Sequence, residues 1–170
     1  MDATAIYYTF STIAQTLAGA LAVLVAFTVF RLAKLDETIR TGKTELTRYS
    51  DWPRRWEALR VGGLKGLEDD LGTRVDLPQR TVYHEAFVAV GQRPRMLRAL
   101  GWALTATVSD IALCFIALPL TPLMASQSAL VRGAAVSIPV AGGIICLGLY
   151  WWLVQTMLYP PRPRVERPVP

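Results

Sequence analysis

The sequence contains few of the residues that build metal sites or disulfide frameworks. It has two cysteines, Cys114 and Cys146, and a single histidine, His84, in 170 residues. No His/Cys spacing suited to zinc is present, and two cysteines cannot staple a small secreted domain. We interpret both cysteines as small packing residues and His84 as an ordinary side chain. No metal or other cofactor is expected.

Nucleotide-binding and nucleophile motifs are also missing. Gly62 and Gly63 are not followed by the residues of a phosphate-binding loop, and no nucleophile elbow is found. The acidic run 68–70 could suggest a cation site, but Leu71 and Gly72 follow it directly, which is typical of a solvated helix end. The chain is therefore not expected to be an enzyme.

Charge is missing from three long stretches of the chain. Residues 3–30 and 133–158 carry no charge, and the first of these stretches ends at Arg31. Residues 99–120 carry a charge only at Asp110. Each stretch exceeds the ~20 residues needed to cross about 30 Å of hydrocarbon. No basic residues precede the first stretch, so we expect a retained helix rather than a cleaved signal peptide. The sequence predicts an all-α integral membrane protein with three transmembrane helices.

Helix breakers suggest how the rest of the chain is organised. Gly42 offers a stop for an extended first helix, a second helix is expected after Asp51, and a third is expected to end at Gly91 before Pro94 opens a membrane helix. The resulting segments are a first transmembrane helix with its extension (1–40), a helical basic loop (41–93), the second and third transmembrane helices (94–159), and a Pro/Arg-rich tail (160–170).

The positive charges lie mainly on one side of the predicted membrane. Fourteen of the eighteen Lys and Arg residues fall between Arg31 and Arg98. By the positive-inside rule this predicts an outer N-terminus, an inner loop and C-terminus, and a place in the bacterial cytoplasmic (inner) membrane. Inner-interface aromatics are expected at Trp102 and 150–152. The net charge of +5 then reflects topology, so we expect membrane lipids rather than nucleic acid as partners.

Asp110 is the most informative residue of the sequence. A carboxylate at mid-membrane costs about 2.5–3.5 kcal/mol on insertion scales, so it is usually paired, protonated or used. At helical spacing it shares a face with small residues, which packs against protein rather than lipid. Those residues are Ala103, Ala106, Cys114 and Ala117.

Other polar residues of the three helices are candidates for a polar path or for helix contacts. Gln15 has the largest unmet hydrogen-bonding capacity in lipid, and its depth makes a bond to Asp110 feasible. Pro139 removes a backbone donor inside the third helix. The complete candidate set, for a pore or an interface, is Asp110, Gln15, Ser11, Thr16, Ser109, Ser137 and Pro139.

Two functions remain open on the sequence. In the first, the chain is a homo-oligomeric cation-conducting channel in which Asp110 forms a ring around a symmetry axis. In the second, it is a non-conducting accessory or scaffold subunit of a larger membrane complex, with Asp110 and Gln15 as assembly contacts to other membrane subunits. A proton-coupled transporter is disfavoured, since the chain is small and shows no paired repeats.

Overall fold

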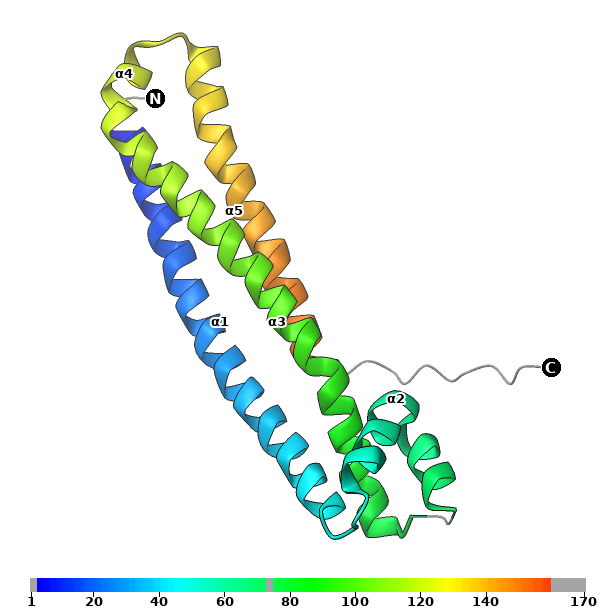
Figure 1. Cartoon of the computed structure of the whole chain (residues 1–170). Coiled ribbons are helices and arrows are strands. Elements are labelled where there is room, and N and C mark those ends of the chain that lie inside the picture. The colour runs from blue at the N-terminus through cyan, green and yellow to red at the C-terminus, as the bar shows by residue number, and fades with distance from the viewer. Residues whose placement is uncertain (1–2, 73–74, 160–170) are drawn as a thin grey trace, which may run out of the picture. The chain divides into compact units, whose positions relative to one another are not determined.

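The computed structural model describes residues 3–72 and 75–159, so the predicted tail 160–170 lies outside the described residues. Every regular element in these ranges is helical. Three helices, α1, α3 and α5, are long and apolar enough to cross a membrane, and they contain the three stretches that the sequence predicted to be helical (Figure 1). The elements are α1 (Ala3–Leu46), α2 (Trp52–Leu71), α3 (Leu77–Ala117), the 3-10 turn η1 (Leu118–Leu120), α4 (Thr121–Ser126) and α5 (Ala129–Leu158).

The chain divides into two compact units, and the long helices contribute to both. We call the first the membrane unit; its described residues are 3–28 and Leu97–Gln155. We call the second the polar unit; its described residues are 29–72, 75–96 and 156–159.

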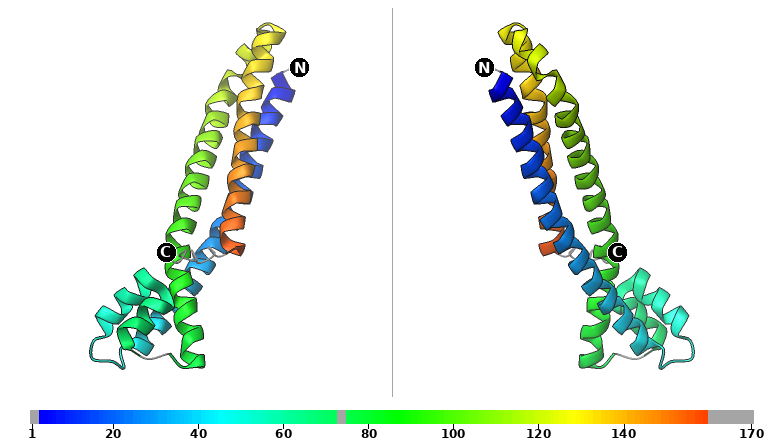
Figure 2. Two further views of the ribbon diagram at one scale, coloured as in Figure 1. Left: turned by 90° about the vertical axis from the view of Figure 1, so that its right-hand side faces the viewer. Right: turned by 90° about the vertical axis from the view of Figure 1, so that its left-hand side faces the viewer.

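The membrane unit consists of α1, α3 and α5 segments that run side by side (Figure 2). Its buried cluster joins Ile6, Phe10 and Ala14 of α1 to Cys114 and Ala117 of α3. Small residues on the facing side of α3 let the helices approach closely, as is common in membrane bundles.

The outer surface of the membrane unit is covered by large apolar side chains. Phe27, Phe115, Ile144 and Trp151 are all exposed. In water such a surface would aggregate, whereas in a bilayer it faces hydrocarbon of matching polarity. Its residue distribution therefore fits a lipid environment.

The polar unit has two clusters of buried apolar side chains. The first contains Leu46, Leu59, Leu67 and Tyr83, which come from α1, α2 and α3. The second contains Leu35 of α1 together with Ala89 and Met96 of α3. The side chains of both clusters include leucine or methionine, whereas the buried face of α3 in the membrane unit carries only small or polar side chains. Large apolar side chains are expected to be enclosed where burial from water drives packing.

Within the polar unit, α2 folds back on itself at Gly63. This glycine has φ +63° and ψ −150°, a conformation that L side chains rarely adopt. Arg54 at the start of α2 consequently forms an ion pair of 2.9 Å with Asp70 near its end. The acidic run 68–70 is thus more than the solvated helix end that the sequence predicted, because Asp70 pairs with an arginine of the other arm of α2.

The predicted stop of the first helix at Gly42 is wrong, since α1 continues to Leu46. Gly42 is buried inside the helix, and a Cβ built on it would lie 2.5 Å from the Cβ of Ala86. The glycine therefore serves the close approach of α3 to α1 within the polar unit rather than a helix end.

The predicted break between Gly91 and Pro94 is also wrong, because α3 is continuous from Leu77 to Ala117 with Pro94 inside it. Tertiary contacts in the polar unit stabilise this stretch. The Gln92 Nε2 donates to the carbonyl oxygens of Thr156 (2.9 Å) and Met157 (3.2 Å) at the end of α5. Arg93 forms a 2.9 Å ion pair with Asp36 of α1.

Candidate functional site

Asp110 lies inside the membrane unit, on the face of α3 that packs against α5. Only 4% of the residue is exposed. Its carboxylate lies against the backbone of Gly142: a Cβ built on this glycine would be 2.7 Å from Asp110 Cγ and closer still to Oδ1. Gly142 therefore provides the space that the carboxylate occupies, and no larger residue fits there without a shift.

The carboxylate of Asp110 is incompletely hydrogen-bonded. Its Oδ2 is buried and has no hydrogen-bond partner within the described residues. None of the ion pairs found among residues 3–72 and 75–159 includes Asp110. A buried polar atom without a partner costs about 1–3 kcal/mol, so this position is held by the packing around it.

A hydrogen-bonded chain connects all three helices of the membrane unit one turn from Asp110. The hydroxyls of Thr107 and Tyr150 lie 2.7 Å apart, and the Tyr150 hydroxyl donates to the carbonyl oxygen of Leu17 at 3.3 Å. The single hydroxyl proton of Thr107 is donated either to Tyr150, which completes this chain, or to Ala103 O at 2.7 Å within α3. These bonds fix the relative rotation of α1, α3 and α5 near the carboxylate.

The sequence did not reveal the role of Tyr150. It was predicted as an interfacial aromatic, but it is only 5% exposed, whereas its neighbours Trp151 and Trp152 are exposed. Thr107, one turn before Asp110, was the available signal, since a hydroxyl on that buried face needs a partner. Which residue of α5 supplies the partner depends on how that helix is rotated.

The other candidates divide between the inside and the outside of the membrane unit. Pro139 is buried beside Gly142, while Ser137 is exposed and its hydroxyl donates to Ala134 O at 2.9 Å. Gln15, Thr16 and Ser109 are exposed, and Ser11 is partly buried. The Gln15 Nε2 donates to Ser11 Oγ at 3.5 Å and not to Asp110. The structure therefore does not gather the set into one polar path.

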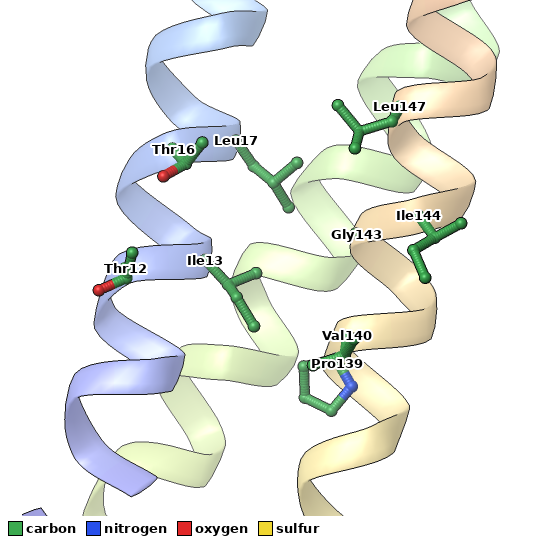
Figure 3. A pocket seen from close by; sticks show the side chains of 9 residues that line it. All are labelled: Thr12, Ile13, Thr16, Leu17, Pro139, Val140, Gly143, Ile144 and Leu147. Carbon is green, nitrogen blue, oxygen red and sulfur yellow. The ribbon is translucent and has the colours of Figure 1, made fainter. Parts of the chain in front are cut away.

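A groove of 250 Å³ lies between α1 and α5 in the membrane unit. Figure 3 shows Ile13 and Leu17 pointing from α1 toward α5, whereas the hydroxyls of Thr12 and Thr16 point away from it. Pro139, Val140, Gly143, Ile144 and Leu147 complete the lining. The groove is apolar on both walls, so it suits a hydrocarbon chain or an apolar side chain better than a hydrated ion.

Metal ligands are not grouped in the described part of the chain: no three His, Cys, Asp or Glu residues there lie close enough to hold an ion. Cys114 and Cys146 are both buried free thiols. No family model, no curated protein and no solved structure matches this chain. Two polar side chains of the membrane unit bear on its function, the enclosed Asp110 and the exposed Gln15.

Proposed function

We propose that this chain is a non-conducting scaffold subunit of the bacterial inner membrane that assembles with further copies of itself. Its N-terminus would lie outside and its polar unit inside, as the distribution of Lys and Arg favours. The observation that carries the proposal is the exposure of Gln15 in an uncharged span, while Asp110 is enclosed within its own subunit.

The exposed face of α1 around Gln15 has the composition of a helix–helix contact. At helical spacing it consists of small or polar residues, none of them buried in the single chain: Ser11, Gln15, Ala18, Gly19, Ala22 and Ala26. We call this set the α1 outer face. Gln15 has two donor hydrogens and an acceptor, of which one long contact to Ser11 Oγ uses little. Facing lipid, the amide would be costly; facing another helix, it can be satisfied.

The exposed side of α5 provides the contrast. Ile144, Leu147 and Trp151 are large, apolar and exposed there. Such a surface loses nothing by facing acyl chains, whereas a surface of alanine and glycine permits the close backbone approach on which membrane helix association depends. We therefore assign the α1 outer face to the subunit contact and this side of α5 to lipid.

A cation-conducting homo-oligomer is the second candidate, and one observation favours it. Thr12, Gln15 and Thr16 are all exposed on α1, so a symmetric ring of α1 helices could line a path with their oxygens. Asp110 would not belong to that path, because it lies against Gly142 inside the subunit. The channel reading thus loses the acidic ring that would concentrate cations.

The test compares assembly and flux in two variants. Gln15→Leu removes the exposed amide, and Thr105→Val removes an exposed hydroxyl that is already bonded to Gly101 O at 3.0 Å within its own helix. We expect native mass spectrometry to show an oligomer for the wild type and for Thr105→Val, with a shift toward monomer for Gln15→Leu. A wild type that is monomeric throughout would contradict the proposal.

Flux separates the two candidates. Potassium flux into liposomes containing the assembled wild type should equal that of empty liposomes. Flux that rises with the protein and falls for Gln15→Leu at matched assembly would establish the channel instead, with α1 lining its path.

A further inference from the structure

The polar unit contains a cavity of 490 Å³ between α1 and α3, separate from the residues of the proposed function. Its α1 wall consists of Arg31, Lys34, Leu35 and Thr38, and its α3 wall of His84, Glu85, Val88, Ala89 and Gln92. The α3 wall is fixed at one end, because the Gln92 side chain donates to two carbonyls at the end of α5. The cavity is thus lined by both apolar and charged side chains, and hydrogen bonds fix one end of its α3 wall.

The basic side chains of this cavity form no close ion pair within the described residues, although Glu85 lies in the same lining. The Nε of Arg31 is buried without a hydrogen-bond partner, so a ligand in the cavity can reach only the terminal nitrogens of this side chain, which also have no hydrogen-bond or ion-pair partner within the described residues. No ion pair found in the same part of the chain involves Arg31 or Lys34. A guanidinium N–H without an acceptor is unfavourable, and phosphate oxygens match the fork of arginine donors especially well.

The position of these residues along α1 corresponds to the headgroup layer of a bilayer. Val29 and Phe30, the last residues of the apolar run, are exposed, and Arg31 follows directly. At 1.5 Å per residue, Lys34 lies about 6 Å beyond Phe30. The headgroup region occupies about 5–8 Å on each side of the hydrocarbon. The two cations therefore lie at the depth of lipid phosphates.

We propose that this cavity binds the phosphate of a phospholipid headgroup, with Arg31 and Lys34 as its ligands. Glu85 is the acidic residue of the wall, and with His84 it offers acceptors for a headgroup that carries hydroxyl or ammonium donors. The preferred lipids are then phosphatidylglycerol and phosphatidylethanolamine, whereas phosphatidylcholine has no such donors. The acyl chains would then run beside Val29 and Phe30, which are exposed at the end of the apolar run.

The experiment measures lipids retained by the full-length protein in micelles containing equimolar phosphatidylglycerol, phosphatidylethanolamine and phosphatidylcholine. Native mass spectrometry of the wild type should show the first two enriched over the third. Arg31→Gln with Lys34→Gln should lower that retention about 25-fold, at about fivefold for each charge. Glu85→Gln should reduce the preference over phosphatidylcholine while leaving phosphate-dependent retention in place.

The matched control is Arg40→Gln with Lys65→Gln, which removes two positive charges at exposed positions outside the cavity. Retention unchanged in the control supports a site, whereas an equal loss in both double variants overturns it in favour of general surface attraction. Arg31→Lys with Lys34→Arg preserves the charge and should retain lipid even if the Gln pair folds poorly. Retention of phosphatidylcholine equal to that of the other lipids also contradicts the proposal.

A second arm identifies the source of the phosphate. Inorganic phosphate is titrated into lipid-free micelles of the same protein, with thermal stability as the measurement. No shift at millimolar phosphate supports the headgroup, since the acyl chains contribute to binding. A shift that disappears in the Arg31→Gln, Lys34→Gln variant shows that the site accepts soluble phosphate and overturns its assignment to lipid.

Discussion

The two units of this chain differ in the kind of side chain that they enclose. In the polar unit, large apolar side chains such as Leu59 and Leu67 are fully enclosed, and charged residues cover the exterior. In the membrane unit many large side chains, such as Phe115 and Ile144, are exposed, and the enclosed positions of α3 hold only small or polar groups, against which Phe10 of α1 packs. The difference shows which solvent each unit was selected for, because lipid gives no reward for enclosing a leucine.

The comparison extends to buried polar atoms. Both units contain buried polar atoms that lack a partner among the described residues, and two of them can be compared: Asp110 Oδ2 in the membrane unit and the Tyr83 hydroxyl in the polar unit. Tyr83 lies within an apolar cluster whose packing would be the same for phenylalanine. Asp110 instead occupies space that a glycine on the facing helix leaves open. The Tyr83 hydroxyl therefore contributes nothing to the packing of its cluster, whereas the Asp110 carboxylate is part of the contact between α3 and α5.

The largest effect on stability is expected from a substitution in the apolar cluster of the polar unit. Leu59→Ala removes a fully enclosed side chain and should lower the free energy of unfolding by about 2–5 kcal/mol. Val61→Ala, at a position 76% exposed on the same helix, should change it by less than about 0.5 kcal/mol. Fluorescence of Trp56, which packs against the cluster, follows the unfolding of this unit in denaturant when the other four tryptophans are replaced by phenylalanine. Equal effects of the two variants would show that Leu59 is not enclosed.

The next prediction concerns the fit between Asp110 and Gly142. Gly142→Ala places a methyl group where the carboxylate lies and should cost about 1–3 kcal/mol, because the two helices must separate or Asp110 must move. Gly148→Ala on the same helix, with no atom within 4 Å of the added Cβ, should be neutral or slightly stabilising. Thermal unfolding in one detergent compares the two.

A double-mutant cycle makes this prediction specific. In an Asp110→Ala background the space is open, so Gly142→Ala should lose most of its cost, which gives a favourable coupling energy. A cost that stays the same in both backgrounds would mean that the carboxylate does not occupy this space.

Local pattern was sufficient for the spans but not for the helix ends. Uncharged length alone defines the three membrane helices, because crossing hydrocarbon requires it. The ends at Gly42 and before Pro94 were wrong because a breaker costs only about 1–3 kcal/mol, which tertiary contacts exceed. The close packing of Gly42 on Ala86 and the bonds of Gln92 are such contacts, and they join residues far apart in sequence.

The candidate site was predictable in its residues but not in its geometry. Asp110 is conspicuous because charge in lipid is rare, and its small-residue face indicates protein contact. Two features depend on the rotation of α5 about its axis. Asp110 contacts Gly142, and Tyr150 rather than Gln15 takes part in the buried hydrogen bonds. Nothing in the sequence of a single apolar helix fixes that rotation.

The smallest effects on stability are expected from tyrosine-to-phenylalanine substitutions, one in each unit. Tyr150→Phe removes a hydroxyl that bonds Thr107 and Leu17 O, and should lower stability by about 0.6–1 kcal/mol. Tyr83→Phe removes a hydroxyl that has no partner within the described residues, and should raise stability by up to about 1 kcal/mol. Thermal unfolding of both variants beside the wild type should therefore show shifts of opposite sign.

Alkaline pH sharpens the Tyr83 half of this comparison. Burial, followed by the nearby Tyr49 and Glu45, raises the pKa of Tyr83 above its ordinary value of about 10. The unfolded chain then loses the phenolic proton at lower pH than the folded chain. The stability that this residue contributes is present below about pH 10 and is lost as the pH rises through the folded pKa. Phenylalanine has no proton to lose, so the advantage of Tyr83→Phe should grow between pH 8 and pH 10.5. An advantage that stays constant over this range would mean that the hydroxyl of Tyr83 is solvated, and the contrast between the two tyrosines would then disappear.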